Sequence, residues 1–167
     1  MSKKVQRNYL EINFLEDLKE KSNFSENYSI NLVDPVDFQL NKFFYKNIGK
    51  KHHWVDRLVW TEKQWIDYVS NKNVKTYVLK NADDFVGYFE LNLHPEKNEV
   101  EIAYLGLLEE YQNMKLGSYL LSIAIKKSFL DKPKRVWVHT CSLDHKNALK
   151  NYLSRGMKIF KTESISV

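Results

Sequence analysis

Residues 101–121, with the sequence EIAYLGLLEEYQNMKLGSYLL, decide the fold that we expect for this chain. The stretch begins with an apolar run typical of a strand, passes through a short polar connection and leads into a segment with Leu116, Leu120 and Ile123 at helical spacing. Gly117 lies at the turn where this helix would begin. The first N–H groups of a helix have no intrahelical acceptor and lie at the positive end of the helix dipole. We therefore expect a strand, a turn and a helix start suited to phosphate.

The first half of the chain predicts two strands and two helices. Strands are expected at residues 9–14 and 28–33, with a charged helical stretch between them. A helix is expected over residues 36–48, because its apolar residues recur at helical spacing. Thr61 followed by Gln64 has the capping-box pattern that marks the start of a second helix.

The second half predicts an antiparallel meander followed by a helix, a strand, a helix and a strand. Residues 75–80, 84–94 and 99–108 are rich in β-branched and aromatic residues and are separated by turn sequences. Residues 135–141 resemble a buried strand, and residues 157–165 are the expected last strand. Between these two strands, Asp144 is the expected N-cap of a helix that carries Ala148, Leu149, Tyr152 and Leu153. The predicted class is α+β (α/β layered), with a mixed, mostly antiparallel sheet, helices on both faces and a single domain over residues 1–167.

The composition favours a cytoplasmic protein without a metal centre. No apolar run in the 167 residues approaches the roughly twenty that cross a bilayer, and the basic start of the chain lacks the apolar stretch of a signal peptide. Cys141 is the only cysteine, which excludes an intramolecular disulfide and fits a reducing compartment. The five histidines show no spacing typical of metal ligands, so we expect no metal.

The net charge of +5 points to anions in general rather than to nucleic acid. Of the 26 basic residues, 22 are lysines spread along the chain, whereas base recognition depends largely on arginine. We therefore expect an attraction for phosphorylated small molecules and argue against a nucleic-acid partner.

Residues 112–117 resemble the main motif of the GNAT (Gcn5-related) N-acetyltransferase superfamily. That motif is Gln or Arg, two variable residues, Gly, one variable residue, then Gly or Ala; this chain has Gln112, Asn113, Met114, Lys115, Leu116 and Gly117. Lys115 replaces the first glycine of the motif. Glycine lets the backbone approach a pyrophosphate closely, so the lysine side chain must point away from the phosphates or fold over them.

A second block has the register of the same superfamily. Ala148, Tyr152 and Gly156 match its Ala, Tyr and Gly, while His145 replaces the usual Asn. The resemblance implies the GNAT acyl-CoA N-acyltransferase fold. A bacterial subfamily without an assigned function is similar to this chain in YKNIGKKHHWVDRLVW (45–60), GYFEL (87–91), VEIAYLGLL (100–108) and VHTCSLDH (138–145).

The resemblance implies acetyl-CoA as cofactor and suggests which residues contact it. Glu101, eleven residues before Gln112, is the candidate base that removes a proton from the attacking amine. Tyr152 is the candidate donor to the departing thiolate, and backbone N–H groups around Leu107 and Leu108 are expected to face the acetyl oxygen. Simpler readings are an ion-paired strand end for Glu101 and core packing for Tyr152. The expected cofactor contacts are Leu107, Leu108, Gln112, Asn113, Met114, Lys115, Leu116, Gly117, Ser118 and His145.

The acceptor is expected to bind beside an aromatic wall in the N-terminal half. Tyr45, Trp54 and Arg57 suit either an apolar molecule with an anionic group or a cation held over the rings, although aromatic residues at helical spacing also form cores. Glu90 is the reserve candidate for the base, and His139 is expected to face the acceptor pocket.

The sequence thus predicts transfer of an acetyl group from acetyl-CoA to a primary amine of a small molecule or peptide, by direct attack. The alternatives are a catalytically silent acyl-CoA-binding domain of the same fold and, with less support, a basic module associated with nucleic acid. The sequence does not identify the amine, and it is compatible with a homodimer.

Overall fold

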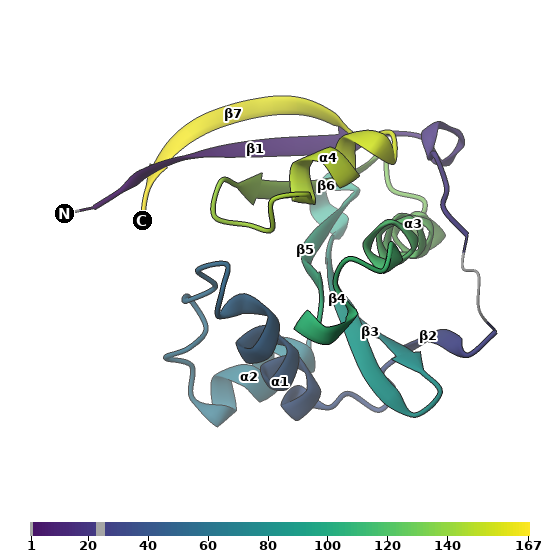
Figure 1. Ribbon diagram of the computed structural model, residues 1–167, viewed down its shortest axis with the longest axis vertical. Coiled ribbons are helices and arrows are strands. Elements are labelled where there is room, and N and C mark those ends of the chain that lie inside the picture. The colour runs from purple at the N-terminus through teal and green to yellow at the C-terminus, as the bar shows by residue number, and fades with distance from the viewer. Residues whose placement is uncertain (1, 23–25) are drawn as a thin grey trace.

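A computed structural model describes residues 2–22 and 26–167, which form the elements labelled in Figure 1. Within these residues the strands are β1 (Lys4–Ile12), β2 (Tyr28–Leu32), β3 (Val74–Asn81), β4 (Asp84–His94), β5 (Glu99–Leu107), β6 (Arg135–Cys141) and β7 (Lys158–Ser166). The helices are α1 (Phe38–Gly49), α2 (Glu62–Val69), α3 (Leu116–Ser128) and α4 (Ala148–Ser154), and short 3-10 turns occur at Leu15–Asp17, Pro95–Lys97, Glu109–Tyr111 and Phe129–Asp131.

All the described strands belong to one sheet in the order β2-β3-β4-β5-β6-β1-β7. Every neighbouring pair is antiparallel except β5 and β6, which run parallel. Parallel strands need a long crossover, which α3 supplies here. The predicted mixed, mostly antiparallel sheet is therefore confirmed.

Helices cover both faces of the sheet, as the sequence predicts (Figure 1). On one face, α3 and α4 bury Leu120, Ile125 and Tyr152 against sheet residues that include Phe89 and Ile102. On the other face, α1 buries its apolar residues against β3 and β4, in a second cluster of Phe44, Ile48, Val78, Tyr88 and Leu108. Apolar burial on two faces contributes most of the stabilisation expected for such a layered domain.

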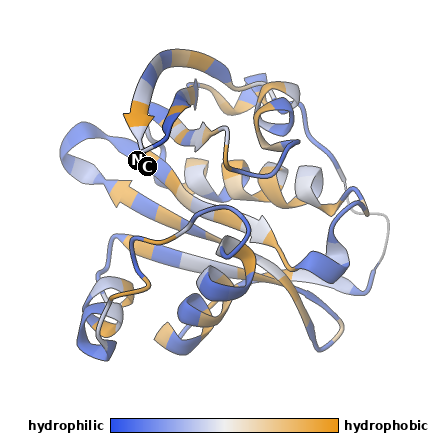
Figure 2. Ribbon diagram, turned by 60° about the vertical axis from the view of Figure 1, so that its left-hand side comes forward, coloured by the Kyte–Doolittle hydropathy of each residue, from blue (hydrophilic) through white to orange (hydrophobic). Residues whose placement is uncertain are grey.

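The starts of α1 and α2 follow local capping rules. The Asp37 carboxylate accepts a hydrogen bond from the Gln39 backbone N–H at 3.0 Å, so α1 begins about two residues later than the sequence predicted. At α2, Thr61 and Gln64 form the predicted capping box in both directions. Both helices carry hydrophilic and hydrophobic residues side by side (Figure 2), because one side of each packs on the molecule and the other meets solvent.

Two expectations about local structure are wrong. The charged stretch after β1 forms only the 3-10 turn Leu15–Asp17, with no α-helix in its described part; residues 23–25 lie outside the described residues. Asp144 does not cap α4, whose N-cap is Asn147. The Asp144 carboxylate instead accepts hydrogen bonds from the Thr140 hydroxyl and, at 3.1 Å, from the Cys141 backbone N–H, so it stabilises the end of β6.

Gly156 connects α4 to β7 in a conformation that requires glycine. Its φ is +104°, and a Cβ there would lie 2.2 Å from the Asp17 carbonyl oxygen. The backbone N–H of Lys19 also donates to the Arg155 carbonyl at 2.9 Å. This contact joins the segment after β1 to the end of α4, next to the strand pair β1 and β7.

Candidate active site

The site is created where β5 and β6 separate. The two strands pair only at Glu99 with Arg135, Val100 with Val136 and Glu101 with Trp137, although β5 continues to Leu107 and β6 to Cys141. Beyond the last pair, both strands line a cleft of about 800 Å³. Figure 1 shows β5 and β6 diverging there, with α3 on one side and α1 on the other. The unpaired edge of β5 therefore faces a cavity rather than a neighbouring strand.

A bulge in β5 determines which side chains face each side of the sheet. Leu91 of β4 pairs with Ile102, and the neighbouring Glu90 pairs with Tyr104. Ala103 therefore has no partner on β4 and is the extra residue of the bulge. Ile102 packs with the α3 cluster, whereas Tyr104 packs with the α1 cluster. Because the bulge shifts the alternation by one residue, Glu101 and Tyr104 lie on the same face, toward α1.

Some backbone N–H groups at the end of β5 point to β4, and others point to the cleft. The Leu108 N–H donates to the Val86 carbonyl at 2.8 Å, so it is already used inside the sheet. Because N–H directions alternate along a strand, Leu107 and Leu105 direct theirs to the unpaired edge. The expectation that the Leu108 amide faces the cofactor is therefore wrong, whereas the Leu107 amide has the predicted direction.

The start of α3 provides free backbone donors at the cleft wall. Its N-cap, Lys115, makes no side-chain cap, and the amides of Asn113, Met114 and Lys115 donate to no backbone carbonyl in the described part of the chain. The first amides of the helix also lack intrahelical acceptors. This turn thus presents a row of N–H groups and the positive end of the helix dipole to the cleft, as an anion requires.

Two non-glycine residues in this turn adopt left-handed conformations. Asn113 has φ of 64° and Lys115 has φ of 62°. Left-handed residues within a turn direct successive N–H groups to one side, which makes a concave anion site. Gly117 also lines the cleft, and a Cβ there would meet no atom closer than 3.7 Å, so the space beside it is open. The Gln112 side chain donates to the Leu107 carbonyl at 3.3 Å and fixes the turn to the end of β5.

Histidines from two loops meet at the wall of the cleft. The rings of His52, from the loop after α1, and His145, from the loop before α4, lie 6.0 Å apart edge to face. Burial, then the neighbouring His52, then Lys146 lower the pKa of His145. His145 Nδ1 accepts a hydrogen bond from the Asn147 N–H at 3.1 Å, which leaves the other ring nitrogen for the cleft.

Tyr152 extends from α4 to the cleft while its ring packs in the core. Burial, with a smaller contribution from the Asp144 carboxylate, raises its pKa well above the usual value for tyrosine. Its hydroxyl is therefore protonated at neutral pH and acts as a hydrogen-bond donor rather than as a strong acid.

Glu101 on β5 and His139 on β6 both line the cleft near the point where the two strands separate. The Glu101 carboxylate lies 3.1 Å from His94 Nε2, is 17% exposed and lines the cleft. His139 stands two residues after Trp137, the β6 partner of Glu101. Withdrawal from water, then the nearby Arg7 guanidinium, lower the pKa of His139, so its ring is neutral at pH 7 and can accept a proton.

Arg57 occupies an aromatic cage at the α1 side of the cleft. It forms an ion pair with Glu90 at 2.9 Å, and Glu90 is fully buried. Asn41 donates to the same carboxylate at 3.0 Å. Burial is the largest single influence and lowers the pKa of Arg57, but the Glu90 carboxylate and the Tyr68 and Tyr104 hydroxyls together raise it above its usual value. The guanidinium carbon lies between 4.2 and 5.7 Å from the ring centres of Tyr45, Trp60, Trp65, Tyr68 and Tyr104.

Most of the predicted site residues line one cleft. These are Trp54, Arg57, Glu101, Leu107, Gln112, Asn113, Lys115, Leu116, Gly117, Ser118, His139, His145 and Tyr152. The cleft does not include Leu108, Met114, Tyr45 or Glu90: Leu108, Tyr45 and Glu90 are buried beneath its wall, and Met114 is 55% exposed outside it. Because Glu90 is enclosed with Arg57 and Asn41, it is not positioned to serve as the reserve base.

Sequence reasoning missed several residues that the structure brings to the cleft. Asp56, Tyr68 and Tyr104 all line it. The first two belong to the segment around the second predicted helix. The sequence did not indicate Tyr104, because in a strand without a bulge its side chain would lie on the other face of the sheet from Glu101.

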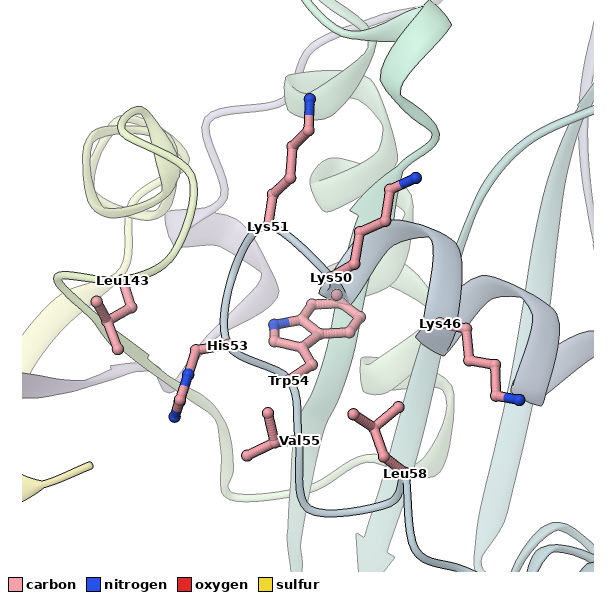
Figure 3. A pocket seen from close by; sticks show the side chains of 9 residues that line it. Lys46, Lys50, Lys51, His53, Trp54, Val55, Leu58 and Leu143 are labelled. Carbon is pink, nitrogen blue, oxygen red and sulfur yellow. The ribbon is translucent and has the colours of Figure 1, made fainter.

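A second, smaller cavity of about 450 Å³ lies behind Trp54. Figure 3 shows the Trp54 ring at its centre, near Val55 and Leu58, with the ends of Lys46, Lys50 and Lys51 pointing away from the ring. His53 and Trp54 line both cavities, so they form the partition between this basic surface and the main cleft.

Neither membrane spans nor metal centres are found in the described residues. None of their helices has the length and apolar character that crossing a membrane requires. Across residues 2–22 and 26–167, His, Cys, Asp and Glu form no group of three arranged to hold a metal ion.

Comparison with known proteins adds a family match and several similar structures. Residues 38–157 match the profile of the acetyltransferase (GNAT) family. A GCN5-related N-acetyltransferase from Sphaerobacter thermophilus has a TM-score of 0.71 and 11% identity, over 99% of this chain and 53% of that chain. One from Kribbella flavida has a TM-score of 0.67 and 13% identity, over 96% and 56%.

A shorter relative covers most of both chains. An aminoglycoside acetyltransferase from an uncultured soil metagenomic sample has a TM-score of 0.66 and 13% identity, over 80% of this chain and 90% of that chain. At such identities the structures share a fold, and this chain spans little more than half the length of the two GCN5-related structures. A comparison with curated proteins finds no match.

Proposed function

Since the chain belongs to the acetyltransferase (GNAT) family, we propose that it transfers the acetyl group of acetyl-CoA to a primary amine. The observation that carries this proposal is the early separation of β5 and β6 next to the uncapped start of α3. The separation leaves an unpaired strand edge along which the extended pantetheine chain of CoA can bind. The helix start offers a set of backbone donors to the pyrophosphate of CoA.

The residues at this site fit acetyl-CoA in charge and in space. The turn of residues 112–118 offers unpaired N–H groups, Lys115 adds a positive side chain, and the space beside Gly117 is open to an approaching phosphate. The Leu107 and Leu105 amides face the unpaired edge, where they can pair with amide groups of the pantetheine chain. His145 lines the same cleft.

Acetyl-CoA supplies a thioester, at whose carbonyl carbon the C–N bond forms while the C–S bond breaks and CoA leaves as a thiolate. An amine must first lose its proton, which costs about 4 to 5 kcal/mol at pH 7 for a pKa near 10.4. Glu101 is the proposed acceptor of that proton, directly or through water, and neutral His139 is the second candidate because it lines the same part of the cleft.

Two further groups stabilise charge as the acyl group moves. The Leu107 N–H, directed to the unpaired edge, is the proposed donor to the carbonyl oxygen. The Tyr152 hydroxyl is the proposed donor to the CoA sulfur. Because the pKa of Tyr152 is raised, it stabilises the thiolate by a hydrogen bond and keeps its own proton.

The test is a screen of primary amines with acetyl-CoA that follows thiol release, beside a calorimetric titration with CoA. Amine-dependent thiol release is the expected result. CoA binding without thiol release for any amine would favour the catalytically silent acyl-CoA-binding domain, and absence of CoA binding would overturn both.

A further inference from the structure

The acceptor end of the cleft has an aromatic wall contributed by β5, by the segment between α1 and α2, and by α2 itself. Trp54 contacts Tyr104 edge to face with ring centres 4.8 Å apart, and Trp60 contacts Tyr68 in the same way at 5.4 Å. All four rings line the cleft. Aromatic faces attract cations as well as apolar groups, so the charges around this wall decide which kind of acceptor fits.

The charge of Arg57 is already balanced within the protein. Its guanidinium contacts the buried Glu90 carboxylate at 2.9 Å, and its faces are covered by Trp60, Tyr68 and Tyr104 at 4.8, 4.2 and 4.4 Å. Arg57 and Glu90 together contribute no net charge to the acceptor end. Arg57 therefore holds the aromatic wall in place and does not attract an anionic acceptor.

Two carboxylates at this end are not balanced in the same way. Asp56 lines the cleft and has no hydrogen-bond or ion-pair partner among residues 2–22 and 26–167. Burial is the main reason that the pKa of Tyr104 is raised, and the Asp56 charge adds to it, so Asp56 lies within electrostatic reach of the wall. Glu101, on the same face of β5 as Tyr104, lies 3.1 Å from His94 Nε2. Asp56 and Glu101 thus line the same cleft as the aromatic wall.

The one lysine in the described lining of the cleft lies elsewhere. Lys115 is the N-cap of α3, at the proposed pyrophosphate end. Arg7 lies 3.9 Å from the Glu163 carboxylate on β7, and His139 has a lowered pKa and is neutral. A lysine and free backbone N–H groups are therefore present where phosphate would bind, and two carboxylates are present where the acceptor would bind.

We propose that the acceptor is an aliphatic diamine or polyamine, whose reacting nitrogen is presented to Glu101 and whose second ammonium group is held by Asp56 against the Trp54, Trp60 and Tyr104 rings. This inference rests on the proposed acetyl transfer, because it defines the substrate of the same cleft. Asp56 is then the residue that selects a second positive charge. Carboxylate contacts and ring faces attract an ammonium group together, and both disfavour a carboxylate at the same position.

Amines of equal length with different far ends test this selection. For each chain length from three to six carbons, the kcat/KM values of the diamine, the monoalkylamine and the terminal amino acid are compared with acetyl-CoA. We expect the diamine to exceed the monoamine by about tenfold or more at its best length, as one charge-assisted contact allows, and the amino acid to be poorest. Asp56→Asn should reduce the ratio of diamine to monoamine toward one.

Asp67→Asn is the matched control, because Asp67 lies on the outer side of α2 in an exposed ion pair with Lys63. This variant removes the same charge and should keep the wild-type ratio. Equal or better use of the monoamine or the amino acid by the wild type, or an unchanged ratio in Asp56→Asn, would overturn the inference while leaving acetyl transfer intact.

Calorimetric titration of the CoA-bound protein with the same diamines separates the two proposals. Diamine binding that is about tenfold weaker in Asp56→Asn, without thiol release from acetyl-CoA, would support the ammonium site at Asp56 and contradict both the proposed transfer and the role of the diamine as acceptor. Absence of diamine binding would overturn the inference even where another amine is acetylated.

Discussion

At the scale of single residues, the two proposed proton-handling groups differ in their surroundings. Glu101 borders the cleft and contacts His94, whereas Tyr152 packs in the core at the wall of the cleft. The first arrangement suits a group that gains and loses a proton, and the second suits a group that keeps its proton and donates a hydrogen bond.

Replacing Glu101 with glutamine should lower the turnover rate at neutral pH by about a hundredfold, the usual effect of losing a general base. The deficit should shrink as the pH approaches the pKa of the amine, because the free amine then arrives without assistance. The measurement is a pH profile of kcat/KM for both proteins. A near-normal rate with a parallel profile would exclude Glu101, and the same profile for His139→Gln would then test the second candidate.

Replacing Tyr152 with phenylalanine should reduce kcat while leaving the affinity for CoA nearly unchanged. Only the hydroxyl is removed, and the ring continues to pack with the α3 cluster. An interaction made only as the thiolate forms affects kcat and not cofactor binding. Steady-state kinetics with a calorimetric CoA titration measure both; an unchanged kcat would leave Tyr152 as a packing residue.

At the scale of elements, the turn from β5 into α3 combines a family motif with one departure from it. Lys115 adopts the left-handed conformation that glycine adopts easily, and it does so at the N-cap. The cost of a left-handed lysine is about 1 kcal/mol, which a contact between its side chain and phosphate could offset.

Gly117→Val should weaken CoA binding far more than Lys115→Gly. A valine side chain would occupy the open space beside the helix start, where a phosphate would approach, while the nearest protein atom is 3.7 Å from the new Cβ. The fold should therefore tolerate the valine, which a thermal melt can verify. Lys115→Gly relieves the strain of the left-handed conformation and removes one charge, so the affinity of this variant for CoA should fall less than that of Gly117→Val. Equal CoA affinities for wild type and Gly117→Val would contradict the phosphate site.

At the scale of the whole molecule, the buried pair of Arg57 and Glu90 connects three parts of the chain. Asn41 of α1 donates to both Glu90 on β4 and Thr76 on β3, and the Arg57 N–H donates to the Tyr45 hydroxyl at 3.0 Å. The segment between α1 and α2 is thereby fixed to the sheet. That segment carries Asp56 and Trp60, so the pair also fixes the proposed acceptor wall.

Arg57→Met should reduce the free energy of unfolding by about 3 to 5 kcal/mol, because it leaves the Glu90 carboxylate buried without its partner. The double variant Arg57→Met with Glu90→Gln should be more stable than the single variant, since no buried charge remains. Urea denaturation measures both, and Lys63→Met, which breaks an exposed pair, is a control expected to cost at most about 1 kcal/mol. If the change in the free energy of unfolding of the double variant equals the sum of the changes in the two single variants, Arg57 and Glu90 are not energetically coupled.

The sequence by itself determined the elements whose signals lie within a few residues of one another. The capping box at Thr61, the meander of β3, β4 and β5 and the strand-to-helix turn at Gly117 are of this kind, because dihedral preferences and side-chain periodicity act locally. The turn also indicated where phosphate is proposed to bind, since a helix start has free N–H groups wherever it occurs.

Only the tertiary structure decided how the other end of the site is built. Where β5 and β6 stop pairing, and that a bulge at Ala103 turns Tyr104 to the same face as Glu101, depends on contacts between strands far apart in the chain. Glu90 and Arg57 are charged residues in the sequence, but packing between α1, α2 and the sheet encloses both and leaves Asp56 in the cleft. Burial and charge balance are properties of the assembled layers, and no local pattern encodes them.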